Sequence, residues 1–264
     1  MLAALPSFSA SSGAELLPVW AWAVLGILSG AIAGSFLATL VLRWPAGRTL
    51  GGRSGCDGCG LVLNVGHLVP VVSFLVMRGR CRSCGARIDP RHPLVEIMAA
   101  IIGGMALALA PGASGAAGAL FGWLLLTLAV LDLEHFWLPD RLTATLAILG
   151  LAAGLVGIAP PIFDRLIGGL AGYSILAAIG FSYARLRGRI GLGQGDPKLL
   201  GAIGLWLGWQ ALPLVLLGAS LAGLAAVIAL AVTGRQVGAT DRVPLGGLMA
   251  VAAWLLWCVA AIAV

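Results

Sequence analysis

The sequence predicts an all-α polytopic membrane protein with about eight transmembrane helices and one small hydrophilic loop domain. Of its 264 residues, 60% are hydrophobic and 10% are charged, whereas soluble domains carry about 25% charged residues. The apolar residues form long continuous runs, not the alternating pattern of a membrane-spanning barrel. The 39 glycines follow no Gly-X-Y period and suit close packing between transmembrane helices. These observations exclude soluble, disordered and collagen-like proteins.

Apolar runs long enough to cross a bilayer define the predicted spans. They lie near 17–42, 94–110, 117–132, 141–160, 164–184, 196–210, 211–233 and 243–264. The division at 210/211 is the least marked. Residues 1–16 contain no Lys or Arg, so we expect a retained first span and not a cleaved signal peptide. We predict three parts: residues 1–42 with the first helix, a loop domain over 43–93, and a transmembrane domain over 94–264.

The basic residues predict the orientation of these spans. With the N-terminus outside, 15 of the 16 Lys and Arg residues fall on the inside, and only Arg165 falls outside. This asymmetry follows the positive-inside rule. The net charge of +6 therefore reflects topology and contacts with the lipid bilayer, and we expect no nucleic-acid partner.

The inside loop contains two C-x-x-C pairs, Cys56 with Cys59 and Cys81 with Cys84. The 21 residues between the pairs match the spacing of a four-thiolate zinc site. The alternatives are two disulfides, which the reducing inside compartment disfavours, and free thiols. Four thiolates leave no open position on the ion, so we expect structural zinc that stabilises a loop too small for a good core.

Two acidic motifs stand at the edges of apolar spans. Asp132 ends the third span, and Asp196 begins the sixth after a glycine-rich stretch that includes Gly193 and Gly195. The topology puts both on the inside edge of the bilayer, where they can meet. One protonated and one ionised aspartate can hydrolyse a peptide bond. Two alternatives remain: carboxylates that cap helices or pair with Arg141 and Lys198, and a proton or ion pathway.

Several motifs, in order along most of the chain, resemble those of bacterial type IV prepilin peptidases, membrane aspartic proteases of the G-x-G-D class. The motifs are G-S-F-L from Gly34 with R-W-P from Arg43, the cysteine pairs around V-P-V-V-S-F, R-H-P-L-V-E from Arg91, L-D-L-E-H through L-P-D ending at Asp140, and G-Q-G-D-P-K-L-L from Gly193.

The resemblance implies that residues 94–264 are an aspartic peptidase domain in the bacterial inner membrane, with Asp132 and Asp196 catalytic. Gly193, Gly195 and Lys198 belong to the second aspartate motif and Asp140 to the first; we expect supporting roles for all four. Asp140 would cap or support the fourth span. The implied substrates are prepilins and pseudopilins, whose short basic leaders stay on the cytoplasmic side.

The family has a second activity, N-methylation of the new N-terminus with S-adenosylmethionine. This sequence departs from the family pattern at Ala38, at His67 and Leu68, and at Pro197. The first two departures fall in parts linked to methylation, and no glycine fingerprint for the methyl donor can be read. The rival functions are a proton-coupled transporter that uses the same aspartates and a membrane scaffold whose zinc loop binds a partner. A transporter would be expected to consist of two similar halves, and the sequence shows no internal repeat.

Overall fold

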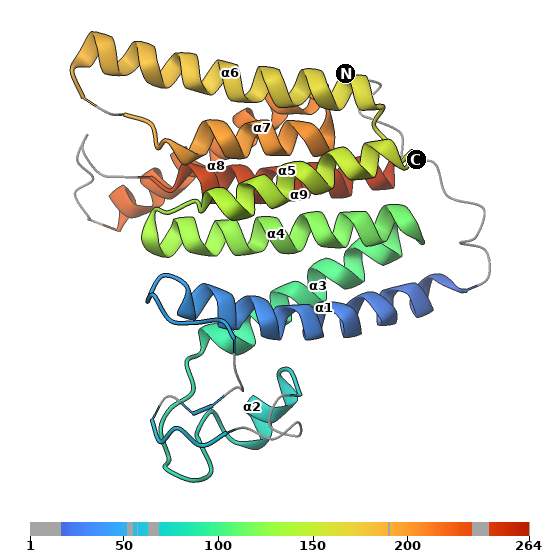
Figure 1. Cartoon of the computed structure of the whole chain (residues 1–264), viewed down its shortest axis with the longest axis vertical. Coiled ribbons are helices and arrows are strands. Elements are labelled where there is room, and N and C mark those ends of the chain that lie inside the picture. The colour runs from blue at the N-terminus through green and yellow to red at the C-terminus, as the bar shows by residue number, and fades with distance from the viewer. Residues whose placement is uncertain are drawn as a thin grey trace. The chain divides into compact units, whose positions relative to one another are not determined.

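The computed structural model describes residues 17–51, 55–56, 58–62, 69–189, 191–233 and 243–263. Its regular structure is helical (Figure 1), which confirms the predicted all-α class. A helix occupies each of the eight predicted runs: α1 (Val19–Arg43), α3 (Arg91–Leu109), α4 (Ala113–His135), α5 (Asp140–Leu155), α6 (Ile162–Arg187), α7 (Gly195–Leu207), α8 (Leu212–Val232) and α9 (Leu245–Ile262). Shorter helices are α2 (Val72–Val76) in the loop and η4 (Trp209–Ala211) between α7 and α8.

Within the described residues, six helices are long and apolar enough to cross a bilayer, namely α1, α3, α4, α6, α8 with η4, and α9. Helix α5 has 16 residues and α7 has 13, so at 1.5 Å per residue they measure about 24 and 20 Å. Both are shorter than the roughly 30 Å hydrocarbon core of a bilayer. The multi-pass architecture is thus confirmed, and the count of eight full spans stays a prediction. Arg53, Arg235 and Arg242, which contribute to the charge asymmetry, and His67 and Leu68 lie outside the described residues.

Contacts divide the chain, within α4, into an N-terminal unit over residues 12–127 and a C-terminal unit formed mainly by residues 128–264. The N-terminal unit is built on the pair α1 and α3. Gly26, Gly30 and Gly34, spaced four residues apart on α1, lie directly against the backbone of α3. A Cβ atom on Gly34 would come within 2.7 Å of the Cα of Glu96. Small residues at this spacing let the two helices pack closely.

The C-terminal unit is centred on α7, whose residues are mostly buried against α5, α6 and α9. Glycines again permit the close packing. A Cβ atom on Gly172 of α6 would lie 2.7 Å from the carbonyl oxygen of Leu200, and one on Gly150 of α5 would lie 2.7 Å from the Trp206 indole. Asp196 therefore opens the innermost helix of the unit.

A single buried arginine stabilises the end of the C-terminal unit at which α6 begins. Arg165 has no exposed surface, and its guanidinium donates five hydrogen bonds of 2.8–2.9 Å, all to main-chain carbonyls. The acceptors are Gly150 in α5, Leu205 in α7, and Ile158, Ala159 and Pro160 in the connection before α6. All five guanidinium donors are thereby used.

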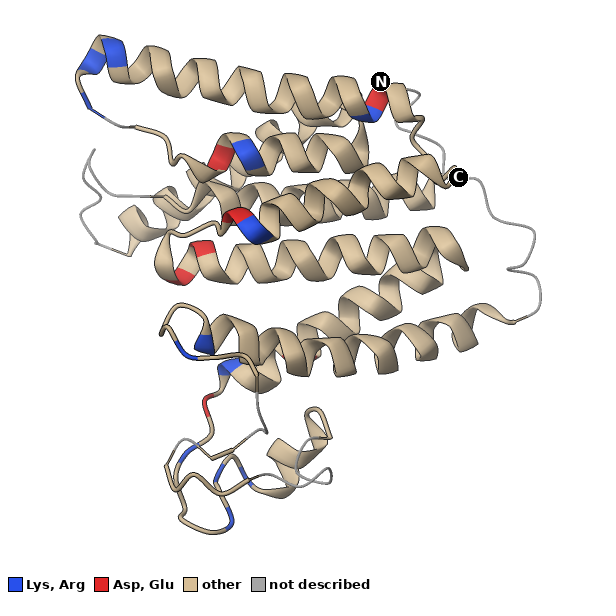
Figure 2. Ribbon diagram, viewed as in Figure 1, with Lys and Arg blue, Asp and Glu red and all other residues tan. Residues whose placement is uncertain are grey.

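At the opposite end of this unit, α4 and α6 end while α5, α7 and α9 begin (Figure 1). Figure 2 shows that the charged residues of the unit gather at the ends of its helices, with long uncharged stretches between them. The two predicted aspartate motifs both lie at the end where α5 and α7 begin.

Candidate active site and metal centre

Asp132 lies in the last turn of α4 and is only 6% exposed. Its Oδ2 atom accepts a 2.7 Å hydrogen bond from the backbone N–H of Gly247, in the first turn of α9. The neighbouring Gly246 makes this approach feasible, because a Cβ atom there would lie 3.0 Å from the same oxygen. Free amides at a helix N-terminus favour a negative charge, so α9 provides a suitable seat for the Asp132 carboxylate.

Asp196 is the second residue of α7 and is also 6% exposed. Its Oδ2 atom accepts a 3.0 Å hydrogen bond from the backbone N–H of Gly193. A Cβ atom on Gly193 would lie 2.9 Å from that oxygen, and one on Gly195 would lie 2.7 Å from the Cβ of Leu138. Both glycines of the motif therefore stand at close approaches: Gly193 to the carboxylate and Gly195 to the segment that joins α4 to α5.

Leu138 connects the surroundings of the two aspartates. Its side chain packs against Gly195 at the start of α7 and against Gly246 at the start of α9. Asp132 and Asp196 are close enough to interact electrostatically. Among the described residues, no Lys or Arg forms an ion pair with either carboxylate. The site thus contains two buried, mutually repelling acids, an arrangement in which one proton is readily shared.

Lys198 and Asp140 pair with each other at this end of the unit. The Lys198 Nζ lies 2.6 Å from Asp140 Oδ1, and both side chains are largely exposed. Asp140 is the first residue of α5, and no side chain caps that helix; its N-cap position is Pro139. The carboxylate therefore bridges α5 to α7 through Lys198 instead of capping its own helix.

The four loop cysteines form two knuckles with the same backbone pattern. In the first, Cys56 N–H donates to Leu61 and Gly60 N–H donates back to Cys56; in the second, Cys81 and Gly85 repeat these bonds with Ala86. Gly60 and Gly85 have φ values of +70° and +74°, which glycine adopts without strain. Gly58 allows close packing within the loop, because a Cβ atom there would lie 2.8 Å from the Cβ of Ala86.

The sulfur atoms of Cys56, Cys59, Cys81 and Cys84 all lie within 4.8 Å of one another. The Cys56 and Cys84 sulfurs are 3.7 Å apart, close to the roughly 3.8 Å edge of a tetrahedron with 2.3 Å zinc–sulfur bonds. No disulfide joins these cysteines, and the clustering of all four sulfurs favours a metal site over the disulfide alternative. In the metal-free cluster, backbone amides of Cys84 and Ser83 lower the pKa of the Cys81 thiol to about 6, while the neighbouring Cys59 sulfur raises the pKa of the Cys84 thiol to about 11. These residues can hold one metal ion.

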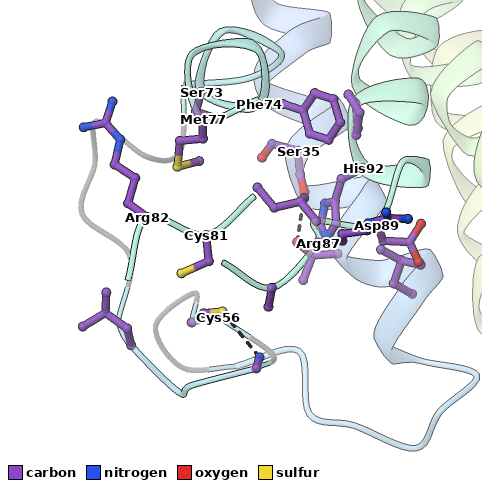
Figure 3. A pocket seen from close by; sticks show the side chains of 18 of the residues that line it. Ser35, Cys56, Ser73, Phe74, Met77, Cys81, Arg82, Arg87, Asp89 and His92 are labelled. Atoms are coloured by element: carbon purple, nitrogen blue, oxygen red, sulfur yellow. Dashed lines mark hydrogen bonds between the residues drawn. The ribbon is translucent and has the colours of Figure 1, made fainter. Parts of the chain in front are cut away.

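A cavity of about 220 Å³ adjoins the cysteine cluster in the N-terminal unit (Figure 3). Its wall is formed by the end of α1, the cysteine knuckles, one face of α2 and the start of α3. Apolar Phe74 and Met77 line it together with charged Arg43, Arg87 and Glu96. A cavity that combines apolar surface with a few charged groups is typical of small-molecule sites.

The sequence alone did not reveal which groups contact the carboxylates of Asp132, Asp196 and Glu96. Gly246 and Gly247 lie in an apolar run and carry no side-chain chemistry, so no local signal marks their amides as partners of Asp132. Leu138 likewise reads as an ordinary apolar residue. Glu96 was visible as an acid at the start of α3, and the structure gives its partner: Glu96 Oε2 accepts a 2.7 Å hydrogen bond from the backbone N–H of Val71.

The fold and these sites define a multi-pass membrane protein with a buried aspartate pair and a four-thiolate loop. Residues 28–110 match the family model described as the Bacterial Peptidase A24 N-terminal domain, and residues 119–228 match that of the Type IV leader peptidase family. The chain belongs to the type IV leader peptidase family, which confirms the resemblance seen in the sequence. Membership in this family together with the apolar helices makes it a multi-pass inner-membrane protein.

Curated relatives extend this match over most of the chain. The prepilin leader peptidase/N-methyltransferase of Aeromonas hydrophila is 41% identical over 208 residues, covering 78% of this chain and 71% of the relative. The protein of the same name from Pseudomonas aeruginosa is 35% identical over 266 residues, covering 90% of this chain and 91% of the relative. The protein of the same name from Burkholderia pseudomallei is 43% identical over 186 residues, covering 70% of this chain and 60% of the relative. No solved structure matches the chain significantly.

Proposed function

We propose that this protein is an aspartic endopeptidase that removes the short basic leader from type IV prepilins and pseudopilins, with Asp132 and Asp196 as its catalytic pair. One observation carries the proposal: buried carboxylates from α4 and α7 share a site and have no cation partner among the described residues. The family and the names of the relatives support the substrate class.

The two carboxyl groups divide the reaction. Because like charges held close together do not both ionise readily, the pair shares one proton. The protonated carboxyl hydrogen-bonds the scissile carbonyl and polarises it, while the ionised carboxylate takes a proton from water as the water oxygen attacks the carbonyl carbon. The tetrahedral intermediate then breaks its C–N bond, and the departing amine receives a proton from the acid of the pair.

The active site and the cysteine loop face the cytoplasm in this proposal, with the N-terminus outside. The placement of 15 of the 16 basic residues on one side supports this orientation. A basic prepilin leader is retained on the same side by the same rule, so its cleavage site meets the membrane edge at which α4 ends and α7 begins.

The metal of the cysteine loop is zinc, and its role is structural. Four thiolates fill a tetrahedral shell and leave no position for a reacting water. Zinc binding would supply the folding energy that a small hydrophilic loop cannot obtain from its own core. Loss of the metal should therefore destabilise the loop without removing either carboxylate from the C-terminal unit.

The second proposed activity is methylation of the new N-terminus, with S-adenosylmethionine as the methyl donor. The cavity beside the cysteine cluster is the candidate donor site, because Phe74 offers a face for the adenine ring and Arg43 and Arg87 can bind a carboxylate. When bound, S-adenosylmethionine supplies the methyl group. We expect Phe74→Ala to reduce methylation while leader cleavage continues, with Val62→Ala, at an exposed position outside the cavity lining, as the control.

The test of the peptidase proposal is incubation of the purified protein with a prepilin, followed by intact-mass analysis. We expect loss of the leader mass and, with S-adenosylmethionine present, the added mass of one methyl group. A parallel sample treated with a chelator mild enough to preserve the fold should keep its cleavage activity. No cleavage of any prepilin would overturn the peptidase proposal. Cleavage that stops in folded, zinc-free protein and returns at once with zinc would make the metal catalytic.

A further inference from the structure

The short helix α2 has two chemically different faces. Ser73, Phe74 and Met77 line the cavity beside the cysteine cluster (Figure 3). The other face carries Val72, Leu75 and Val76, whose exposed fractions lie between 54% and 66%. We refer to these three residues as the outer face of α2. An apolar surface on a hydrophilic loop normally has a partner that covers it.

The position of α2 along the neighbouring transmembrane helix indicates what this partner is. The backbone N–H of Val71, directly before α2, donates a 2.7 Å hydrogen bond to Glu96 of α3. Glu96 lies five residues after Arg91, the first residue of α3, which is about 7.5 Å along the helix axis. Because α3 is a candidate membrane span, α2 begins beside its second turn, at the depth of the membrane–water boundary.

The local backbone indicates that this placement is enforced. Val71 has a φ value of +60°, which is an outlier for a β-branched residue. Such a conformation persists only where surrounding contacts over-determine it. The hydrogen bond to Glu96, which is itself only 8% exposed, is one such contact. The outer face of α2 is therefore held in one orientation relative to α3.

Basic side chains follow the apolar face directly. Arg78, Arg80 and Arg82 come immediately after α2 and are all exposed. Apolar residues that enter the boundary between headgroups and acyl chains, flanked by basic residues that contact anionic headgroups, characterise membrane-surface anchors. The charge of the arginines and the apolar character of the outer face thus both complement a lipid surface.

We infer that α2 is a membrane-surface anchor of the cysteine loop: its outer face enters the leaflet in which α3 begins, and Arg78, Arg80 and Arg82 bind anionic lipid headgroups. The anchor holds the cavity and the cysteine cluster at the membrane surface. This inference depends on the membrane placement of α3 and not on the catalytic assignment of the aspartates, so the two can fail separately.

The experiment places an environment-sensitive fluorescent amino acid at position 75, in full-length, zinc-loaded protein reconstituted into vesicles of phosphatidylethanolamine and phosphatidylglycerol. Its fluorescence is quenched in turn by lipids with brominated acyl chains and by iodide in the water. The same probe at Val62, an exposed residue of the first cysteine knuckle outside the proposed anchor, is the matched control. We expect the brominated lipids to quench the probe at 75 strongly and iodide to quench it weakly, with the reverse at 62.

Two results would overturn the inference. Strong quenching by iodide and none by brominated lipid would put the outer face in water, and protection from both quenchers would mean that protein covers it. Zinc content checks that each labelled protein has a folded loop, and a second probe position at Val76 guards against a local effect at 75. In the variant Arg78→Gln/Arg80→Gln/Arg82→Gln, lipid quenching at 75 should fall in the phosphatidylglycerol vesicles. An unchanged signal would remove the headgroup part of the inference.

Discussion

The two ends of the C-terminal unit treat buried charge in opposite ways. At one end Arg165 is enclosed, and each of its donors has a carbonyl partner in α5, in α7 or in the connection before α6. At the other end Asp132 and Asp196 are nearly as buried, but they repel each other and are held by backbone amides from glycines. A fully satisfied charge stabilises structure, whereas an incompletely satisfied one retains hydrogen-bonding capacity for a substrate.

Glycine makes the close contacts at both ends possible. At the Arg165 end a Cβ atom on Gly154 would lie 2.7 Å from Arg165 Cδ, while the carbonyl acceptors are main-chain groups that any residue presents. The aspartate end needs a backbone that comes close to a carboxylate, and glycine stands at each such place: Gly193 for Asp196, and Gly246 for Asp132. Glycine at these positions is a requirement of geometry and not of flexibility.

The largest effect on stability is expected from Arg165→Met. The substitution leaves several buried carbonyls without a donor, and each unsatisfied group costs about 1–3 kcal/mol. The free energy of unfolding should fall by about 3 kcal/mol or more, measured by thermal unfolding in detergent. Arg141→Met, at an exposed arginine of α5, is the control and should change it by about 0.5 kcal/mol or less. Equal melting temperatures for the two variants would contradict the structural role of Arg165.

A smaller effect, confined to activity, is expected from Gly246→Ala. The added Cβ atom would lie 3.0 Å from Asp132 Oδ2 and 2.7 Å from Leu138 Cδ1, so the carboxylate must shift. Displacement of a catalytic group by about 1 Å can lower the reaction rate about 100-fold. We therefore expect the cleavage rate to fall roughly 10- to 100-fold. Gly247→Ala keeps the N–H donor, and its Cβ atom would meet nothing nearer than 3.3 Å, so its loss should be only a few-fold. A Gly246→Ala protein with wild-type kcat/KM would show that the close approach is irrelevant.

The smallest effect is expected from the exposed pair of Lys198 and Asp140. Exposed ion pairs contribute about 0.2–1 kcal/mol, so Asp140→Asn and Lys198→Gln should each lower the cleavage rate only a few-fold. Because the side chains meet at 2.6 Å, the double variant should lose less than the sum of the single losses. Strict additivity would show that the pair does not act together in positioning Asp196.

Much of the architecture could be predicted because apolar runs and paired motifs are local signals. All eight predicted apolar runs are helical. The weakly marked division predicted at 210/211 corresponds to a break between α7 and α8, formed by Gly208, which has a φ value of +79°, and by η4. The Cys-x-x-Cys spacing predicted the cluster of four cysteines directly. The lengths of α5 and α7 were less predictable, because loops at their ends are also apolar.

The contacts that seat the carboxylates could not be predicted, because they join residues far apart in sequence. Gly247 lies 115 residues after Asp132, and Lys198 lies 58 residues after Asp140. In the sequence, Arg165 stands out only as the basic residue predicted to lie outside. No sequence pattern indicates that its guanidinium binds five main-chain carbonyls. Main-chain groups supply nearly all of these partners, and every residue type has them.

The central claim, that the aspartate pair carries out cleavage, is tested most directly by Asp132→Asn and Asp196→Asn. Purified variants are assayed for prepilin cleavage together with their thermal unfolding and zinc content, and Glu134→Gln on the same helix end is the matched control. We predict at least a roughly 1,000-fold loss of cleavage for each aspartate variant, with unfolding and zinc content unchanged and with Glu134→Gln still active. Cleavage at the wild-type rate by either aspartate variant would contradict the claim.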